Sequence, residues 1–220
     1  MSPRRKFSDA RRRQILKAAV QVIASKGLCD TGIKDVADQA GTSPALVIYY
    51  FGTKDALLAE TLAFADERFY AKTAEAVAGM ASARDRLVEL VRCSCSVGEA
   101  EDDFDEWVLW LDLWARAPRD PDVARDRAAM DRRWRTTIAE IVREGQASGE
   151  FAPVDVDAFA LRLAALIDGL AILVVLRDPE VSRDRMFDLC METCAGELGF
   201  PWTAEDRAAL ATPRRAAASG

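Results

Sequence analysis

The sequence contains no histidine, the side chain most often used as a general base near neutral pH. Its absence excludes Ser/His and Cys/His nucleophile pairs and most zinc sites. The motifs GxGxxG, GxxxxGK(S/T) and GxSxG are also missing. An enzyme would have to use carboxylates, lysine or cysteine alone. We therefore predict that the protein is not an enzyme and has no cofactor and no metal site.

Cysteines are few and odd in number, at Cys29, Cys93, Cys95, Cys190 and Cys194. Residues 1–14 are charged and lack an apolar segment, so no signal peptide is expected. We predict reduced thiols in a cytoplasmic protein. Cys190 and Cys194 are four residues apart and could share a helix face, and small buried side chains are favoured there over a metal or redox pair.

A long hydrophobic run is missing as well. The most apolar stretch, residues 163–176, is too short to span a bilayer, so we expect a buried helix and no membrane association. It contains Asp168 and Gly169. A carboxylate at this place needs a partner, either across a dimer interface or on a ligand. The dimer interface is the favoured interpretation.

Positive charge is outnumbered by negative charge overall, 30 Lys and Arg against 36 Asp and Glu, but is in excess at one end. Residues 1–55 hold ten Lys or Arg and five Asp, a net charge of +5, which leaves −11 on the remainder of a chain whose total is −6. The basic runs Arg4-Arg5-Lys6 and Arg11-Arg12-Arg13 lie in this part. A basic head on an acidic body favours contact between the head and a polyanion, although a basic run alone is more often only a solvated face.

Almost every segment has helical periodicity, and no alternating strand pattern is found. The expected fold is all-α, with about nine helices. We predict a three-helix domain at residues 1–55, a larger helical domain at 56–203 and a frayed tail at 204–220, with 203–210 able to add a turn or two. The expected helices cover residues 8–26, 33–40, 43–51, 54–78, 83–97, 103–116, 121–147, 155–177 and 181–198.

The segment GTSPALVIYYFGTKDAL, residues 41–57, contains two helix starts ten residues apart, at Ser43-Pro44 and at Thr53. A helix at 33–40, a Gly41-Thr42 turn and a short helix at 43–51 are typical of a helix-turn-helix, whose second helix enters the DNA major groove. We expect Val47 and Phe51 to pack inward. The outward face is expected to carry Pro44, Ala45, Tyr49 and Tyr50. Half-buried packing is the alternative for the tyrosine pair.

The stretch DVADQAGTSPALVIYYFGTKDALL, residues 35–58, resembles the DNA-binding domain of TetR-family transcriptional regulators. The resemblance covers residues 8–60. It implies DNA contact by Lys34, Thr42, Ser43, Pro44, Ala45, Tyr49, Tyr50 and Lys54. The sequence departs from the family pattern at Gly32, Leu46 and Ile48. The changes at Gly32 and Ile48 remove hydroxyls, so the DNA-reading helix is more apolar than usual.

The resemblance further implies that residues 1–55 are the DNA-binding domain and that residues 56–203 form a helical effector-binding and dimerisation domain. Residues 107–169 are similar to the BetI-like branch. Trp107, Trp110, Leu111 and Trp114 recur at one helix face. They indicate either a plain core or the wall of a ligand pocket. We predict ligand contact by these four residues together with Phe69, Asp105, Glu106, Trp134, Leu166 and Leu170, and Ile138 close by.

Six acidic residues lie between Glu99 and Glu106. They suit a solvated loop before a helix N-terminus. The other interpretation is that one or two of Asp105, Glu106 and Asp112 face the tryptophans. Carboxylates beside aromatic faces favour an organic cation, such as a choline-like compound, a polyamine or a cationic drug.

Together these patterns predict a homodimeric transcriptional repressor that leaves a palindromic double-stranded operator when a small molecule binds. The helices at 155–177 and 181–198 are expected to pair with their mates in a four-helix bundle. The alternative is a helical small-molecule-binding protein or enzyme whose N-terminal domain is only a packing module. An activator or an architectural DNA-binding protein would share the head but need no pocket.

Overall fold

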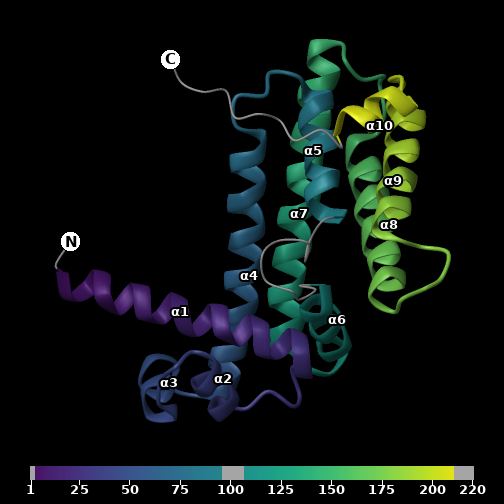
Figure 1. Ribbon diagram of the computed structural model, residues 1–220. Helices are drawn as coiled ribbons and strands as arrows, with labels where there is room; N and C mark the ends of the chain where they lie inside the picture. The colour runs from purple at the N-terminus through teal and green to yellow at the C-terminus, as the bar shows by residue number, and fades with distance from the viewer. Residues whose placement is uncertain (1–2, 96–106, 211–220) are drawn as a thin grey trace.

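The computed structural model describes residues 3–95 and 107–210 (Figure 1). Over these residues all regular structure is helical, as predicted, and no strand is present. The helices are α1 (Pro3–Lys26), α2 (Ile33–Gln39), α3 (Pro44–Phe51), α4 (Lys54–Val77), α5 (Ala83–Cys95), α6 (Trp107–Arg116), the short 3-10 helix η1 (Ala117–Arg119), α7 (Pro121–Ser148), α8 (Val156–Val175), α9 (Arg183–Leu198) and α10 (Ala204–Leu210).

The first three helices enclose a small core of their own. Val47 and Phe51 of α3 are buried against Val36 and Ala37 of α2 and the apolar face of α1, as predicted. The boundaries follow from capping. The Ser43 hydroxyl accepts a hydrogen bond from the Leu46 N–H at 3.2 Å, and Pro44 occupies the first turn.

Helix α4 connects this head to the rest of the molecule, where it stands between α1–α3 at its start and α5 and α7 further along (Figure 1). The Thr53 hydroxyl caps it by accepting from the Ala56 N–H at 3.1 Å. Leu57 joins the core of the head, whereas Leu58 and Leu62 join a second cluster with α6 and the end of α1. One continuous helix therefore belongs to both parts.

The largest core lies among α5, α7, α8 and α9, which run side by side in the body (Figure 1). Glu150 ties the α5 N-terminus to the end of α7, because its carboxylate accepts from the Ser82 hydroxyl at 2.5 Å and the Ala83 N–H at 3.0 Å. Residues 204–210, predicted as part of a frayed tail with a turn or two, form α10, and Asp206 pairs with Arg84 at 2.7 Å.

Helix α8 leaves one apolar face uncovered. Leu161 is 52% exposed and Leu176, at its C-terminal end, is 69% exposed. A Cβ added at Gly169, on the same face, would meet no atom within 4 Å. Of the helices that the structure describes, α8 is the one long and apolar enough to cross a membrane by length and composition, and 39% of its apolar window is buried inside the chain. This face calls for a covering surface.

Candidate functional site

The α2–α3 pair has the geometry of a helix-turn-helix. After α2 the chain turns at Gly41, whose φ is 59°, and the Thr42 N–H donates to the Ala37 carbonyl at 2.9 Å. Positive φ at this position favours glycine because a side chain would clash with its own backbone. The turn leaves the N-terminal part of α3 open, with Ser43, Pro44 and Ala45 all exposed.

The two adjacent tyrosines of α3 have different surroundings. Tyr49 is 79% exposed and offers its ring and hydroxyl to whatever binds this face. Tyr50 was predicted to face outward with Tyr49, but it is half-buried against the core of the head. A one-residue step on a helix turns the side chain by about 100°, so the two cannot share a face. The exposed apolar neighbour of Tyr49 is Ile48.

Two lysines, at the starts of α2 and α4, lie near the exposed face of α3. Lys34 is exposed in the first turn of α2, and the Lys54 ammonium at the start of α4 donates to the Cys29 carbonyl at 3.0 Å. That contact holds Lys54 beside the free N–H groups of the α4 N-terminus, where the helix dipole also favours an anion. Both lysines therefore place positive charge beside the exposed face of α3.

The N-terminal basic run has mixed roles. Arg12 forms an ion pair with Glu60 of α4, and its guanidinium lies over the Phe51 ring at 5.2 Å. Arg11 donates to Gln14 at 3.0 Å. Arg12 thus braces α1 against α3 and α4, while the side chains of Arg4, Arg5 and Lys6 lie outside those that the structure describes.

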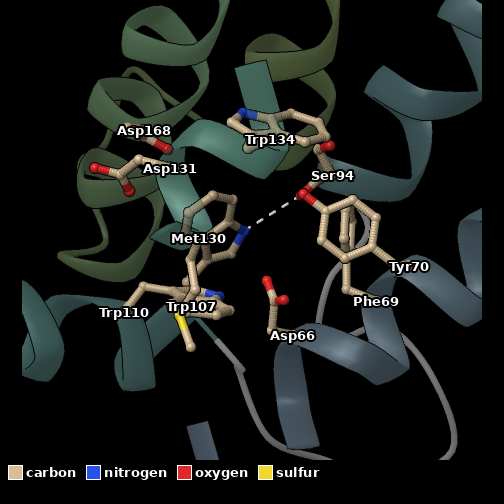
Figure 2. A pocket seen from close by; sticks show the side chains of 10 residues that line it. All are labelled: Asp66, Phe69, Tyr70, Ser94, Trp107, Trp110, Met130, Asp131, Trp134 and Asp168. Atoms are coloured by element: carbon tan, nitrogen blue, oxygen red, sulfur yellow. Dashed lines mark hydrogen bonds between the residues drawn. The ribbon is translucent and has the colours of Figure 1, made fainter. Parts of the chain in front are cut away.

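A cavity of about 90 Å³ lies in the body among α4, α5, α6, α7 and α8 (Figure 2). Its size suits a small organic molecule. Aromatic rings make up much of the wall, and Phe69 and Trp134 meet edge to face at 5.6 Å between centroids. The lining residues are Asp66, Phe69, Tyr70, Ser94, Trp107, Trp110, Met130, Asp131, Trp134 and Asp168.

Part of the predicted ligand set lines this cavity, namely Phe69, Trp107, Trp110 and Trp134. Leu111, Trp114, Leu166 and Leu170 do not line it; Trp114, Leu166 and Leu170 belong to the surrounding core. Ile138 is fully buried in the same core. Asp105 and Glu106 lie outside the described residues. Trp107 and Trp110 of the predicted stripe face the cavity, whereas Trp114 packs against the core and the neighbouring Leu109 and Leu113 face α1.

Sequence reasoning missed the polar half of the cavity. Asp66, Asp131 and Asp168 come from α4, α7 and α8 and converge on it (Figure 2). Burial raises the pKa of all three carboxyl groups, that of Asp168 to about 7. Burial likewise raises the pKa of the Tyr70 phenol. The only available signal was Asp168 inside an apolar run, and it was interpreted as a dimer contact; the structure places it in the cavity.

Asp112, one of three acidic residues that could have faced the tryptophans, does not do so. Its carboxylate points to the head and accepts a hydrogen bond from the Leu28 N–H at 2.7 Å. The cause is its position on α6: residues 109, 112 and 113 lie on the side that packs on α1. Asp112 therefore connects the two parts of the molecule instead of contacting a ligand.

A second, wider hollow of about 520 Å³ lies nearer the head and shares Met130 with the aromatic cavity. It contains no aromatic ring. Its polar groups include Asp120, which pairs with Arg116 at 3.7 Å, and Asp122, which pairs with Arg125. The aromatic cavity, although smaller, combines rings with buried carboxylates, and we regard it as the effector site. No cluster of three metal-ligating side chains occurs in residues 3–95 and 107–210.

Comparison with known proteins finds two families that match this chain. Residues 15–61 match the family described as bacterial regulatory proteins, tetR family. Residues 83–199 match the family described as BetI-type transcriptional repressor, C-terminal. The HTH-type transcriptional regulator BetI of Rhizobium meliloti (strain 1021) is 30% identical over 182 residues, which span 82% of this chain and 85% of that protein.

Solved structures also resemble this chain. A transcriptional regulator from Saccharomonospora viridis, crystallised in complex with choline, is 34% identical, with a TM-score of 0.76 over 85% of this chain and 96% of that one. A TetR-family regulator from Rhodococcus sp. is 28% identical, with a TM-score of 0.74 over 86% of this chain and 98% of that one.

Proposed function

The chain belongs to the TetR family of transcriptional regulators, which are not enzymes, and we propose that it is a cytoplasmic homodimeric repressor released from a palindromic operator by a small organic cation. The observation that carries the proposal is the pairing of an exposed helix-turn-helix with a separate cavity lined by tryptophans and carboxylates. A packing module would not need Tyr49 exposed, and an architectural DNA-binding protein would not need the cavity.

DNA contact is assigned to the exposed face of α3 and its neighbours. Ser43, Pro44 and Ala45 stand at the N-terminus of α3, where recognition helices contact base edges. The Tyr49 phenol can donate to a phosphate, and its ring can lie on a sugar or a thymine methyl group. Lys34, Thr42 and Lys54 supply contacts to phosphates, and half-buried Tyr50 contributes at the edge of this surface.

The uncovered face of α8 supports the dimer. Leu161, Ala165, Gly169, Ile172 and Leu176 recur along one side of the helix, and Ala165 and Gly169 are small enough for a second helix to approach closely. On α9, a Cβ added at Gly196 would also meet no atom within 4 Å. Two copies related by a twofold axis would bury both faces and present two α3 helices to a palindromic site.

Aromatic faces beside carboxylates support a cationic effector. Indole rings attract ammonium groups, and the attraction increases when the site is shielded from water. The Saccharomonospora viridis relative was crystallised with choline, which is such a cation. Choline and related ammonium compounds are therefore the first ligands to try.

One titration tests the proposal. The purified protein is titrated by fluorescence anisotropy against the DNA that flanks its own gene, at two salt concentrations, with and without choline. We expect a saturable palindromic site, a steep salt dependence and weaker binding in the presence of choline. If the protein binds the flanking DNA and all fragments from a genomic selection equally weakly, sequence-specific regulation is contradicted.

A further inference from the structure

The carboxylates of the cavity differ in whether they already have a cationic partner. Asp66 pairs with Arg133 at 3.0 Å, an arginine that also pairs with the exposed Glu67, and Asp131 pairs with Arg127 at 2.7 Å. Asp168 has neither a hydrogen-bond donor nor an ion-pair partner among residues 3–95 and 107–210. One carboxylate of the three therefore remains without its own counter-charge.

Asp168 occupies a half-buried position on α8 between fully buried neighbours. Ile167 and Ala171 are each 1% exposed, and Asp168 itself lines the cavity. From α7, Asp131 and Arg127 act on its charge with opposite signs. Asp66 and Tyr70 face the same cavity from α4, Ser94 from α5 and two indoles from α6, and α9 provides no lining residue. Nothing nearby fully neutralises the Asp168 carboxylate.

An unpaired carboxylate in such a place is costly. Removing it from water without a partner disfavours the charged form, so the group either keeps a proton or recruits a cation. The rings of Trp107, Trp110 and Trp134 line the space in front of it (Figure 2). They would hold the methyl groups of an alkylammonium but offer no oxygen, nitrogen or sulfur ligand to a bare metal ion.

Building on the function proposed above, we infer that Asp168 is the counter-ion of the effector and that the cavity accepts one positive charge. In the empty protein Asp168 carries a proton, and the bound effector takes the place of that proton. Asp66 and Asp131 already have arginine partners, and Glu67, which shares Arg133, is exposed to water. Asp168 is then the cavity carboxylate whose charge a ligand would neutralise. A monovalent alkylammonium fits this balance. A diamine or polyamine would leave its second charge uncompensated.

The exchange of proton for cation predicts a pH dependence with a definite sign. Burial, and then the nearby Asp131 charge, raise the pKa of Asp168 to about 7, while Arg127 opposes the rise. Below that pH the group is mostly protonated and must release its proton before a cation binds. The affinity for a cation should therefore increase with pH below about 7, by up to about tenfold per pH unit, and level off above about 8.

The test is isothermal titration of the full-length protein with choline, tetramethylammonium and the uncharged carbon analogue 3,3-dimethylbutan-1-ol. Titrations in two buffers of different ionisation enthalpy count the protons released. We expect the wild type to prefer choline over the neutral analogue and to release a substantial fraction of a proton at pH 6.5. Putrescine should bind more weakly than choline.

Asp168→Asn should lower choline affinity on the order of 30-fold, because a desolvated charge pair is lost. It should also abolish proton release and the preference for charge, yet still bind operator. The matched control is Asp157→Asn, on an exposed part of the same helix, whose carboxylate pairs with Arg143 at 2.6 Å. Choline binding by this variant should equal that of the wild type.

Several outcomes would overturn the inference. One is an Asp168→Asn protein that binds choline with wild-type affinity and proton release. If that variant fails to fold, two measurements on the wild type still test the inference, namely the number of protons released and the preference for choline over the neutral analogue. The absence of both would contradict the role of Asp168. If the wild type binds operator but neither cation, the cationic effector is wrong and this inference fails with it, while regulation of transcription stands.

Discussion

The carboxylate of Asp112 in α6 accepts a 2.7 Å hydrogen bond from the backbone N–H of Leu28, just after α1 ends. Residues of the same helix, Trp107 and Trp110, line the aromatic cavity. Leu109 and Leu113 pack with Val20 and Ile23 of α1. Helix α6 thus contacts the proposed effector with one face and the DNA-binding head with another, and Asp112 is the polar contact of this joint.

We predict that Asp112→Ala weakens communication between the two sites more than it weakens either site. Choline and operator should each bind within a few-fold of wild type when alone. The factor by which choline lowers operator affinity should shrink several-fold, since typical coupling amounts to about 1–3 kcal/mol. Operator titrations with and without choline measure this factor. Asp112→Asn, which keeps an acceptor oxygen, is the control, and an unchanged factor in Asp112→Ala would contradict the prediction.

Substitutions on the head should separate two kinds of DNA contact. Lys54→Ala should weaken operator binding and reduce the slope of log affinity against log salt by about 1, because one phosphate contact is lost. Tyr49→Ala should cost about 1–3 kcal/mol at the operator and less on unrelated DNA if the ring contacts a base. Anisotropy titrations at several salt concentrations provide both quantities. Lys72→Ala, far along α4, serves as the control and should change neither.

The uncovered face of α8 makes a prediction about assembly. Gly169→Leu should fold, because its Cβ would meet nothing within 4 Å in one protomer and leucine favours helix more than glycine does. It should nevertheless weaken the dimer by blocking close approach of a second helix. Sedimentation velocity measures the mass, and Gly169→Ala should have a smaller effect. A Gly169→Leu protein that stays dimeric at low micromolar concentration would place the interface elsewhere.

Glu150 should make stability depend on acid pH. Its hydrogen bonds with Ser82 and the α5 N-terminus lower its pKa to about 2 from the usual 4.5. A group whose pKa is lower in the folded state stabilises the protein above its unfolded value, and this contribution is lost as pH falls from about 4.5 towards 2. Glu150→Gln should cost about 1 kcal/mol at pH 7 and almost nothing near pH 2. Urea unfolding at both pH values is the check. An equal cost at both would indicate packing instead of charge.

Gly145 of α7 has no room for a side chain. A Cβ there would lie 2.1 Å from Cδ2 of Phe151, which is itself buried. Gly145→Ala should therefore destabilise the body by about 1–3 kcal/mol despite the better helix propensity of alanine. Thermal unfolding measures the loss. Phe151→Leu in the same chain should restore part of it, and a Gly145→Ala protein as stable as wild type would show that Phe151 moves aside at no cost.

The sequence predicted the helices and the head well because their signals are local. Ser43-Pro44 and Thr53 set the starts of α3 and α4 through capping, and the spacing of Val36, Val47 and Phe51 identified the inner faces. Periodicity states that a helix has an apolar side but not towards which neighbour it turns. For that reason the spacing placed Trp107 and Trp110 on one face, but it could not tell which of Asp105, Glu106 and Asp112 would turn away from the tryptophans, as Asp112 does.

The polar part of the cavity could not be predicted from the sequence for a different reason. Asp66, Asp131 and Asp168 are separated by 65 and 37 residues along the chain and meet only because α4, α7 and α8 pack around the same space. Each alone resembles an ordinary surface or helix carboxylate. The pairing of Asp66 and Asp131 with arginines, which isolates Asp168, depends on side-chain placement that no spacing rule encodes.

The continuity of α4 has a mechanical consequence. Lys54 begins the helix and Phe69, at the cavity wall, lies fifteen residues further along, which corresponds to about 22 Å at a rise of 1.5 Å per residue. A tilt of about 10° around the cavity end would therefore carry the other end through about 4 Å. In a twofold assembly both ends would move, changing their separation by as much as about 8 Å against the roughly 34 Å between successive major grooves. A small tilt of α4 at the cavity wall would thus be enough to move α3 of one protomer out of register with its major groove.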